Sequence, residues 1–453
     1  MAAGRARAII ALPHRPSCYR GVHLAVSQTA EAPAAALVPK RKRIAGAIVT
    51  GHAFQHMYAD GFLVLLPSIY DAFGLTGFSA GALAAVRQGS AGLLTMGGGF
   101  VVDMFSGRRG LLLSGSLFLM GLGYLLVAAS PNYTVLLLAL TLGSATGSFW
   151  HPVGLGLLST TFPANRAFVM SLHRSAGSLG ETLTPLVVGL VLALITWREV
   201  LLAGFGIMTV VSIGLYIVLA RLGLQTSASD TRGLREQLGE LGRLLKTETA
   251  LRPLLLVSGL RGMADRSFIF FLPLFIAEGL REVDADVGVA RIGFVVAYHL
   301  VVFSVLGIFV PPLLGALADR VGRKPVMIGA LVGSLVPLGL LSVSPSLGLG
   351  FTVLIALVGM FRFVVANLTQ AGALDLAEGR RLEGSMVGLL WGNNALFGSL
   401  SPLIAGIIVD RVSGGNAFAV VFPYALALNL LALVAAFWLP SRRGPAQRSA
   451  AAS

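Results

Sequence analysis

The chain has 453 residues, of which 55% are hydrophobic and only 12% are charged, and its mean hydropathy is +0.83. A soluble domain of this length cannot bury so much apolar surface, so the composition excludes a soluble globular protein and predicts a polytopic membrane protein. The single cysteine excludes an intrachain disulfide and a thiolate metal cluster. The net charge of +14 is explained either by an acidic partner such as nucleic acid or by basic residues gathered on the cytoplasmic side of a membrane.

The amino-terminal segment, residues 1–43, is rich in Ala and Arg and lacks the uninterrupted apolar core of a signal peptide. We expect it to be a disordered cytoplasmic tail. An over-long start and an organellar transit peptide are the alternatives.

Apolar runs of about 20 residues match the ~30 Å thickness of a bilayer core. Twelve such runs are found, near residues 45–73, 79–102, 110–130, 133–158, 167–195, 199–220, 254–277, 288–317, 325–343, 347–374, 384–409 and 417–439. They predict an all-α membrane protein with two six-helix bundles, at residues 44–220 and 254–440, followed by a cytoplasmic tail at 441–453.

The polar segment between the bundles, residues 221–253, carries Leu234, Leu238, Leu241 and Leu245 at helical spacing. This spacing predicts an amphipathic helix that lies on the cytoplasmic surface and tethers the two halves.

Basic residues are distributed unevenly between the predicted loops. Most of the 34 Lys and Arg fall in predicted cytoplasmic segments, and the external loops hold Arg198, Arg281, Arg291 and Arg411. This is the positive-inside pattern, so both termini are predicted to be cytoplasmic. It explains the net charge without nucleic acid as a partner.

Two short motifs occur at matching places in the two halves. The segment Gly315–Lys324 joins the predicted eighth and ninth spans, and a degraded copy at Gly99–Arg109 joins the second and third. Thr184-Pro185 and Ser401-Pro402 match in the same way in the fifth and eleventh spans. Such repeats are typical of transporters whose halves move against each other around a central site.

The twelve spans and the paired loops resemble the major facilitator superfamily over residues 44–440. Within it, three short segments are similar to the fosmidomycin resistance protein group: His56-Met-Tyr-Ala-Asp60, Phe149-Trp-His-Pro152 and His173-x-x-x-Gly177-x-x-Gly180. The resemblance implies a multi-pass protein of the bacterial inner membrane that works by rocker-switch alternating access. It also implies gating by the paired loops, through Gly99, Asp103, Arg108, Arg109, Gly315, Asp319, Arg320, Gly322, Arg323 and Lys324.

Ionisable residues inside spans are costly and indicate function. His52, His56 and Asp60 stand at i, i+4 and i+8 on one face of the first span, and His173 and Glu181 share a face of the fifth. Burial favours an uncharged carboxyl group, so we predict that these five residues carry protons. The alternative is that His56 and Asp60 only satisfy each other while packing the bundle.

Further polar residues are predicted to line the substrate cavity: Arg87, Trp150, His151, Arg174, Arg261, Asp265, Arg362, Asn367, Gln370, Trp391, Asn393 and Asn394. Arginines outnumber acids in the spans, which favours an anionic or zwitterionic substrate. Arg261 and Asp265 are expected to pair, whereas Arg362 has no acid within one helical turn and is expected to be free for a ligand.

Two departures from the superfamily pattern weaken the prediction of antiport. Thr184 stands where a glycine is expected before Pro185, and the fourth span lacks an embedded arginine.

No phosphate-cradling loop or catalytic motif is found in the sequence, so an enzyme, a cofactor and a metal are not predicted. The function predicted is a proton-coupled antiporter, acting as a monomer, that exports a small amphiphilic or anionic compound, as in drug resistance. A proton-linked importer of a small organic acid is the alternative, and a non-transporting sensor with the same fold is a more distant one.

Overall fold

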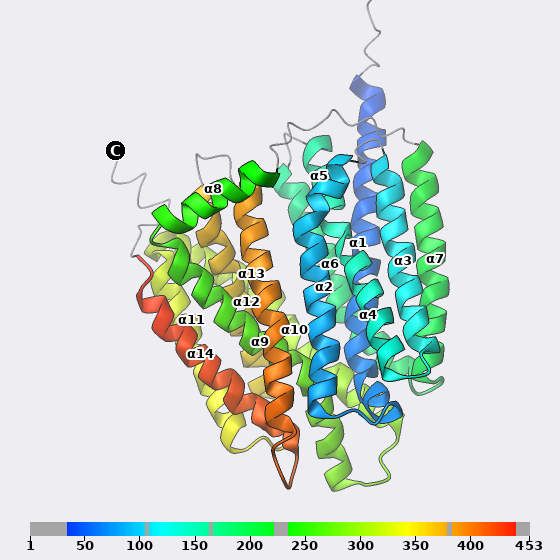
Figure 1. The fold of residues 1–453 in the computed structure, drawn as a ribbon, viewed down its shortest axis with the longest axis vertical. Coiled ribbons are helices and arrows are strands. Elements are labelled where there is room, and N and C mark those ends of the chain that lie inside the picture. The colour runs from blue at the N-terminus through cyan, green and yellow to red at the C-terminus, as the bar shows by residue number, and fades with distance from the viewer. Residues whose placement is uncertain (1–33, 105–107, 163–165, 222–233, 378–382, 441–453) are drawn as a thin grey trace, which may run out of the picture.

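The computed structural model describes residues 34–104, 108–162, 166–221, 234–377 and 383–440, and the regular structure of these residues is helical (Figure 1). The N-terminal half contains α1 (Ala34–Ala72), α2 (Gly77–Met104), α3 (Arg109–Ala129), α4 (Tyr133–Ser148), α5 (Trp150–Thr161), α6 (Arg166–Val191) and α7 (Trp197–Arg221). After α8 (Leu234–Thr247), the C-terminal half contains α9 (Leu251–Val283), α10 (Val289–Val321), α11 (Arg323–Val343), α12 (Leu349–Ala377), α13 (Glu383–Val409), the short η2 (Ala417–Val420) and α14 (Val421–Phe437).

The predicted all-helical membrane fold is confirmed. Eight segments of the described chain are long and apolar enough to cross a bilayer, and they correspond to α3, α4 with α5, α7, α10, α11, α12, α13, and η2 with α14. The other long helices, α1, α2, α6 and α9, carry many of the ionisable residues that the sequence predicted to be functional, which lowers their mean hydropathy.

Two helix boundaries differ from the expected ones. α1 begins at Ala34, so it extends into the segment 1–43 that was expected to be a tail, because Ala, Leu, Lys and Arg are strong helix formers. The predicted fourth span is divided at Phe149 into α4 and α5. Pro152 lacks an N–H group and its ring crowds the carbonyl group four residues earlier, at Ser148, which interrupts the helix.

The two halves meet mainly where α2 packs along α13 and α6 packs along α10. Glycines at equivalent repeat positions make both contacts close. A Cβ atom on Gly406 would lie 2.2 Å from the carbonyl oxygen of Gly77, and one on Gly189 would lie 2.7 Å from the Cβ of Ala297. The repeated segments that end in Gly189 and Gly406 thus serve the same purpose in each half, which is to hold the opposite half at short range.

We call the end of the bundle that carries α8 the linker end and the opposite end, with the connections α1–α2, α9–α10 and α13–η2, the far end (Figure 1). Polar contacts join the halves at the far end. The carboxylate of Asp410 accepts hydrogen bonds from the backbone N–H groups of Gly77, at 2.5 Å, and Phe78, at 2.8 Å. Asp71 forms an ion pair with Arg281. These contacts hold the two halves together at the far end.

We expect the substitution Asp71→Asn to open the far end more often. A partly exposed ion pair contributes at most about 1 kcal/mol, so its loss should raise the open population by up to about fivefold. Leu192 is buried beside Gly293 at this end. A cysteine at position 192, in a chain that also carries Cys18→Ser, becomes accessible to a labelling reagent when the far end opens. The measurement is the labelling rate with a membrane-impermeant maleimide.

The matched control is Asp286→Asn, which makes the same change on the exposed loop of the same end. Equal labelling rates in the two variants would show that the Asp71–Arg281 ion pair does not hold the halves together.

Candidate functional site

A group of ionisable side chains lies in the middle of the N-terminal half. We call it the His–carboxylate cluster, and it consists of His52, His56 and Asp60 on α1, His151 on α5, and His173 and Glu181 on α6. α1 and α6 approach closely because α6 presents glycines to α1. A Cβ atom on Gly177 would lie 2.6 Å from the His52 ring, and one on Gly180 would lie 2.5 Å from the backbone oxygen of Ala53.

His56 connects the two acids of the cluster. Its Nδ1 lies 3.3 Å from Oδ2 of Asp60 and 3.1 Å from Oε1 of Glu181. When both acids are ionised they only accept hydrogen bonds, so in that state Nδ1 carries a proton and donates toward both of them. Asp60 belongs to α1 and Glu181 to α6, and one imidazole ring thus joins two helices through two acids.

The remaining histidines surround His56. Nδ1 of His52 donates a hydrogen bond of 2.7 Å to the backbone carbonyl of His173, and the two rings are stacked with centroids 3.6 Å apart. The ring of His151 lies 5.3 Å from that of His52 and 5.7 Å from that of His56. The four rings form one continuous group, and each has at least one buried ring nitrogen without a hydrogen-bond partner.

Arg174 is the basic side chain of this region. Its guanidinium lies 3.9 Å from the Glu181 carboxylate, and its side chain is 61% exposed. The distance and the exposure make this a weak contact.

A second group, the arginine cluster, lies in the middle of the C-terminal half and consists of Arg261, Asp265 and Arg266 on α9 and Arg362 on α12. Arg261 forms the expected i, i+4 ion pair with Asp265. Arg362 was expected to be free for a ligand, and this expectation is wrong, because its Nε lies 3.4 Å from the same carboxylate. The acid lies on a different helix, which is why the sequence does not reveal it.

The arginine cluster contains three guanidinium groups and one carboxylate. Arg362 also lies over the rings of Phe303 and Phe363, 5.2 and 4.8 Å from their centroids, and these contacts stabilise its charge. A cavity of about 10 Å³, lined in part by Arg261, Asp265 and Arg362, is large enough for about one water molecule. The cluster therefore keeps an excess of positive charge.

The two clusters face each other across the interface between the halves. Arg362 interacts electrostatically with Glu181 of the opposite half, and Arg266 interacts with Arg87 of α2. The Arg266 side chain is exposed although it lies at mid-helix and within 3.0 Å of the position of a Cβ on Gly398.

Several other predicted cavity residues have structural partners. Arg87 donates to the backbone oxygen of Ala59 and lies over the Phe62 ring. Trp150 is fully buried against Gly51, so it packs the N-terminal half rather than lining a cavity.

Predicted residues on α12 and α13 are more varied. Asn393 donates to the backbone oxygen of Leu255 at 3.0 Å, and Asn394 accepts from Ser258 at 3.3 Å. The Trp391 ring lies 5.9 Å from that of His151 in the opposite half. Asn367 is exposed and Gln370 is half-buried.

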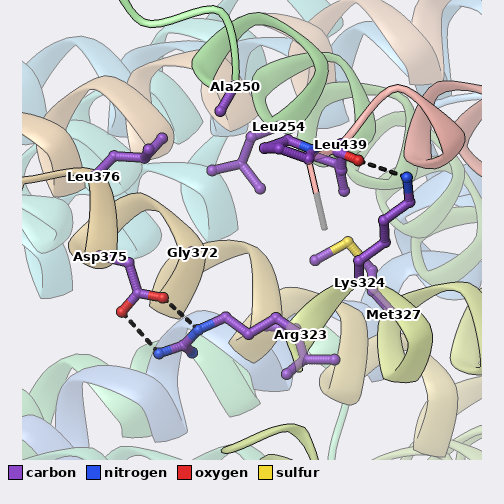
Figure 2. Close-up of a pocket in the computed structure, with 11 residues that line it drawn as sticks. Ala250, Leu254, Arg323, Lys324, Met327, Gly372, Asp375, Leu376 and Leu439 are labelled. Carbon is purple, nitrogen blue, oxygen red and sulfur yellow. Dashed lines mark hydrogen bonds and ion pairs between the residues drawn. The ribbon is translucent and has the colours of Figure 1, made fainter. Parts of the chain in front are cut away.

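The predicted gate residues of the second loop are tied within their own half. Arg323 donates to both oxygens of Asp375, at 2.6 and 2.9 Å, and Lys324 donates to the backbone oxygen of Leu439 (Figure 2). Lys324 also donates to the backbone oxygen of Phe437. These contacts border a cavity of about 70 Å³ at the linker end. They connect the α10–α11 loop to α12 and α14.

The other gate residues are less constrained. Gly322 has a φ angle of +99°, which glycine adopts without strain and which allows α11 to start directly after α10. Asp319, Arg320 and Arg108 are exposed, Gly315 is half-buried and Arg109 is buried. Gly99 and Asp103 lie on α2, and their side chains lie outside the described part of the chain.

Sequence reasoning missed the partners that lie on other helices. Asp375 binds Arg323, and Asp71 and Asp410 close the far end. Each of these acids stands near the end of a predicted span, and an isolated acid at a span end is the signal that points to an ion pair or a helix cap.

Comparisons with known proteins agree with this architecture. A family model described as the Major Facilitator Superfamily matches residues 48–298 and 254–453. The Fosmidomycin resistance protein of Escherichia coli (strain K12) is 25% identical over 406 residues, which cover 88% of this chain and 93% of that protein. An uncharacterized MFS-type transporter of Bacillus subtilis (strain 168), YfnC, is 24% identical over 331 residues, covering 71% and 74%.

Solved structures show the same fold at lower identity. The nucleoside transporter NupG superposes with a TM-score of 0.70 at 14% identity, covering 87% of this chain and 99% of that one. A bacterial homologue of the human lysosomal transporter Spinster, in an inward-facing and unoccupied conformation, superposes with a TM-score of 0.63 at 16% identity, covering 88% and 95%.

Proposed function

The chain belongs to the major facilitator superfamily, and from this premise we propose that it is a proton-coupled carrier that exports a small amphiphilic or anionic compound by alternating access. The predicted resemblance to the fosmidomycin resistance protein group is confirmed by the match over most of the chain. The observation that carries the proposal is the position of His56 between Asp60 and Glu181.

This arrangement is suited to proton transfer. Isolated charges inside a membrane protein are costly, and they are tolerated when they are paired or reach water. Two carboxylates stand beside one imidazole, so binding or losing a proton changes the charge balance of the whole group. His56 shares its Nδ1 proton with both acids, and a proton arriving at one acid can pass to the other.

α6 connects the proton site to the interface between the halves. The same helix carries Glu181, packs on α1 through Gly177 and Gly180, and packs on α10 of the opposite half through Gly189. A change in the charge of Glu181 alters the force between α1 and α6. This is a direct route from proton binding to movement of one half against the other.

The substrate site is proposed to lie between the two clusters. Arg362 interacts with Glu181 across the interface, and the arginine cluster retains an excess of positive charge. A compound with one anionic group would be attracted to the arginines, while Trp391 and the exposed apolar side chains of α13 would contact its apolar part. An amphiphilic anion satisfies both requirements.

Alternating access is supported by the unequal state of the two ends. The far end is closed by Asp71–Arg281 and by Asp410, whereas Arg323 and Lys324 at the linker end bind within their own half. We place the linker end in the cytoplasm of a bacterium, with both termini, and in this arrangement a substrate enters from the cytoplasm. The paired loops would act as the gate that closes when the halves rock.

Import of a small organic acid is the second candidate, and the excess of arginine favours it. Protonation of Asp60 and Glu181 removes negative charge near the cavity, so an anion and a proton would bind together rather than compete. Export is preferred because the relative that covers most of the chain is named as a resistance protein.

We expect purified protein in proteoliposomes to move a substrate in the direction opposite to the proton flow that an imposed pH gradient drives. A panel of metabolites and antibiotics is screened, and internal pH and substrate are followed together. Substrate that leaves the compartment into which protons enter indicates export by antiport. Substrate and protons that move in the same direction indicate import, and substrate movement that is insensitive to the gradient would contradict proton coupling.

A further inference from the structure

Three histidines of the His–carboxylate cluster form a group that the proton mechanism does not explain. His52, His56 and His151 each place one ring nitrogen within 4.8 Å of those of the other two. Proton exchange between acids requires only His56. We propose that His52, His56 and His151 bind a divalent transition-metal ion, with Zn²⁺ as the best match.

The hydrogen bonds of His52 and His56 prepare both rings for a metal. Nδ1 of His52 donates to a backbone carbonyl, and Nδ1 of His56 donates to carboxylates. In the neutral form of each ring the proton is thereby placed on Nδ1, which leaves the lone pair of Nε2 free to bind a metal ion in place of a proton. Metal-binding histidines generally have this arrangement, in which the second nitrogen donates to an oxygen and orients the ring.

The nitrogens left over have no other role among the described residues. Nε2 of His52, Nε2 of His56 and Nδ1 of His151 are buried and make no hydrogen bond. Buried polar atoms are normally paired, so unpaired nitrogens on three neighbouring rings indicate a missing ligand. The type of ligand follows from the chemistry, because neutral imidazole is an acceptor and binds cations such as Zn²⁺, Ni²⁺ and Cu²⁺.

The spacing of the rings fits such an ion. His52 and His56 are one helical turn apart on α1, the spacing used by helical zinc sites, and His151 approaches from α5. Nitrogens bound to one ion at ~2.0–2.1 Å lie about 3.3 Å apart, so the three rings would have to move inward slightly. Three imidazole ligands leave a fourth position for water or for an anionic group of a substrate.

The site lies next to the interface between the halves, because the His151 ring is 5.9 Å from Trp391 of α13. His56 belongs to this site and to the proposed proton site. One consequence rests on the proposed function: a divalent cation on Nε2 of His56 adds positive charge beside Asp60 and Glu181, which opposes protonation of both acids, so Zn²⁺ should inhibit proton-coupled transport.

The test is direct metal binding to the purified full-length chain in detergent, measured by the visible absorption of Co²⁺ and by Zn²⁺ competition. We expect one ion per chain with a tetrahedral Co²⁺ spectrum. His52→Gln and His151→Gln should each weaken binding at least about tenfold. His299→Gln is the matched control, since His299 is a buried histidine of the other half bound to Val295 and Thr352, and it should bind as tightly as the unmodified chain.

Gel filtration and circular dichroism identify variants that fail to fold. His151 lies on a different helix from His52, so His151→Gln tests metal binding independently of any folding defect in His52→Gln. Absence of stoichiometric binding, or equal loss in His299→Gln, would overturn the proposal. Glu181→Gln keeps all three imidazoles and should still bind the ion. If it binds the ion and also still accumulates substrate, the proton mechanism fails while the metal site stands.

Discussion

Replacing Glu181 with Gln should reduce proton-driven accumulation of substrate to background. A carboxamide has nearly the shape of a carboxyl group but does not take up or release a proton. The contact of 3.1 Å with His56 is retained as a neutral hydrogen bond, and the packing of α6 on α1 is preserved. Exchange of substrate down its own gradient should continue, because it does not require a net proton movement.

The measurement is uptake or efflux in proteoliposomes with and without a pH gradient. Glu282→Gln is the matched control, since it makes the same chemical change at an exposed position near the end of α9 and should leave transport unchanged. Asp60→Asn should give the same result as Glu181→Gln if the two acids act through His56. Gradient-driven accumulation by both acid variants would rule out the His–carboxylate cluster as the proton site.

Replacing Asp265 with Asn should lower the free energy of unfolding by about 3–5 kcal/mol, because two buried arginines would lose the acid that they share. The side chains of Arg261 and Asp265 are each only 10% exposed, so water screens the remaining charges weakly. The same loss should abolish transport, since the arginine cluster would no longer hold its arrangement. Unfolding by SDS in mixed micelles, followed by circular dichroism, measures the change.

Asp319→Asn is the matched control, because the same change on the exposed end of α10 should alter stability by less than about 0.5 kcal/mol. Adding Arg261→Met to Asp265→Asn should restore part of the stability, since an apolar side chain needs no counter-charge. If the Asp265→Asn variant were as stable as the unmodified chain, water would already solvate the arginine cluster.

In both clusters, the contacts within one helix were predictable and the contacts between helices were not. His52, His56 and Asp60 follow one another at i, i+4 and i+8, so their common face on α1 can be read from the spacing. The spacing does not reveal that Glu181 lies 3.1 Å from His56, because α6 is more than one hundred residues further along the chain. Arg362 shows the same limit, since its acid lies on α9.

The paired loops that were predicted to act as a gate were predictable in position but not in their contacts. The duplicated loops mark where the chain turns between spans, and Gly322 has the positive φ angle that such a turn uses. Arg323 binds Asp375 and Lys324 binds the end of α14, within one half. Which partner a basic side chain finds depends on how the helices are tilted, and the loop sequence does not contain that information.

By itself, the sequence determined that this is a membrane protein, where its spans lie, that its two halves repeat, and which ionisable residues lie inside spans. These properties follow from local hydropathy and from helical spacing, which act over a few turns of one helix. Only the tertiary structure decided which of those residues meet: His56 with two acids, Asp265 with two arginines, and three imidazoles around one point. Contacts between helices depend on packing over the whole bundle, where glycines such as Gly177 set the distance of closest approach.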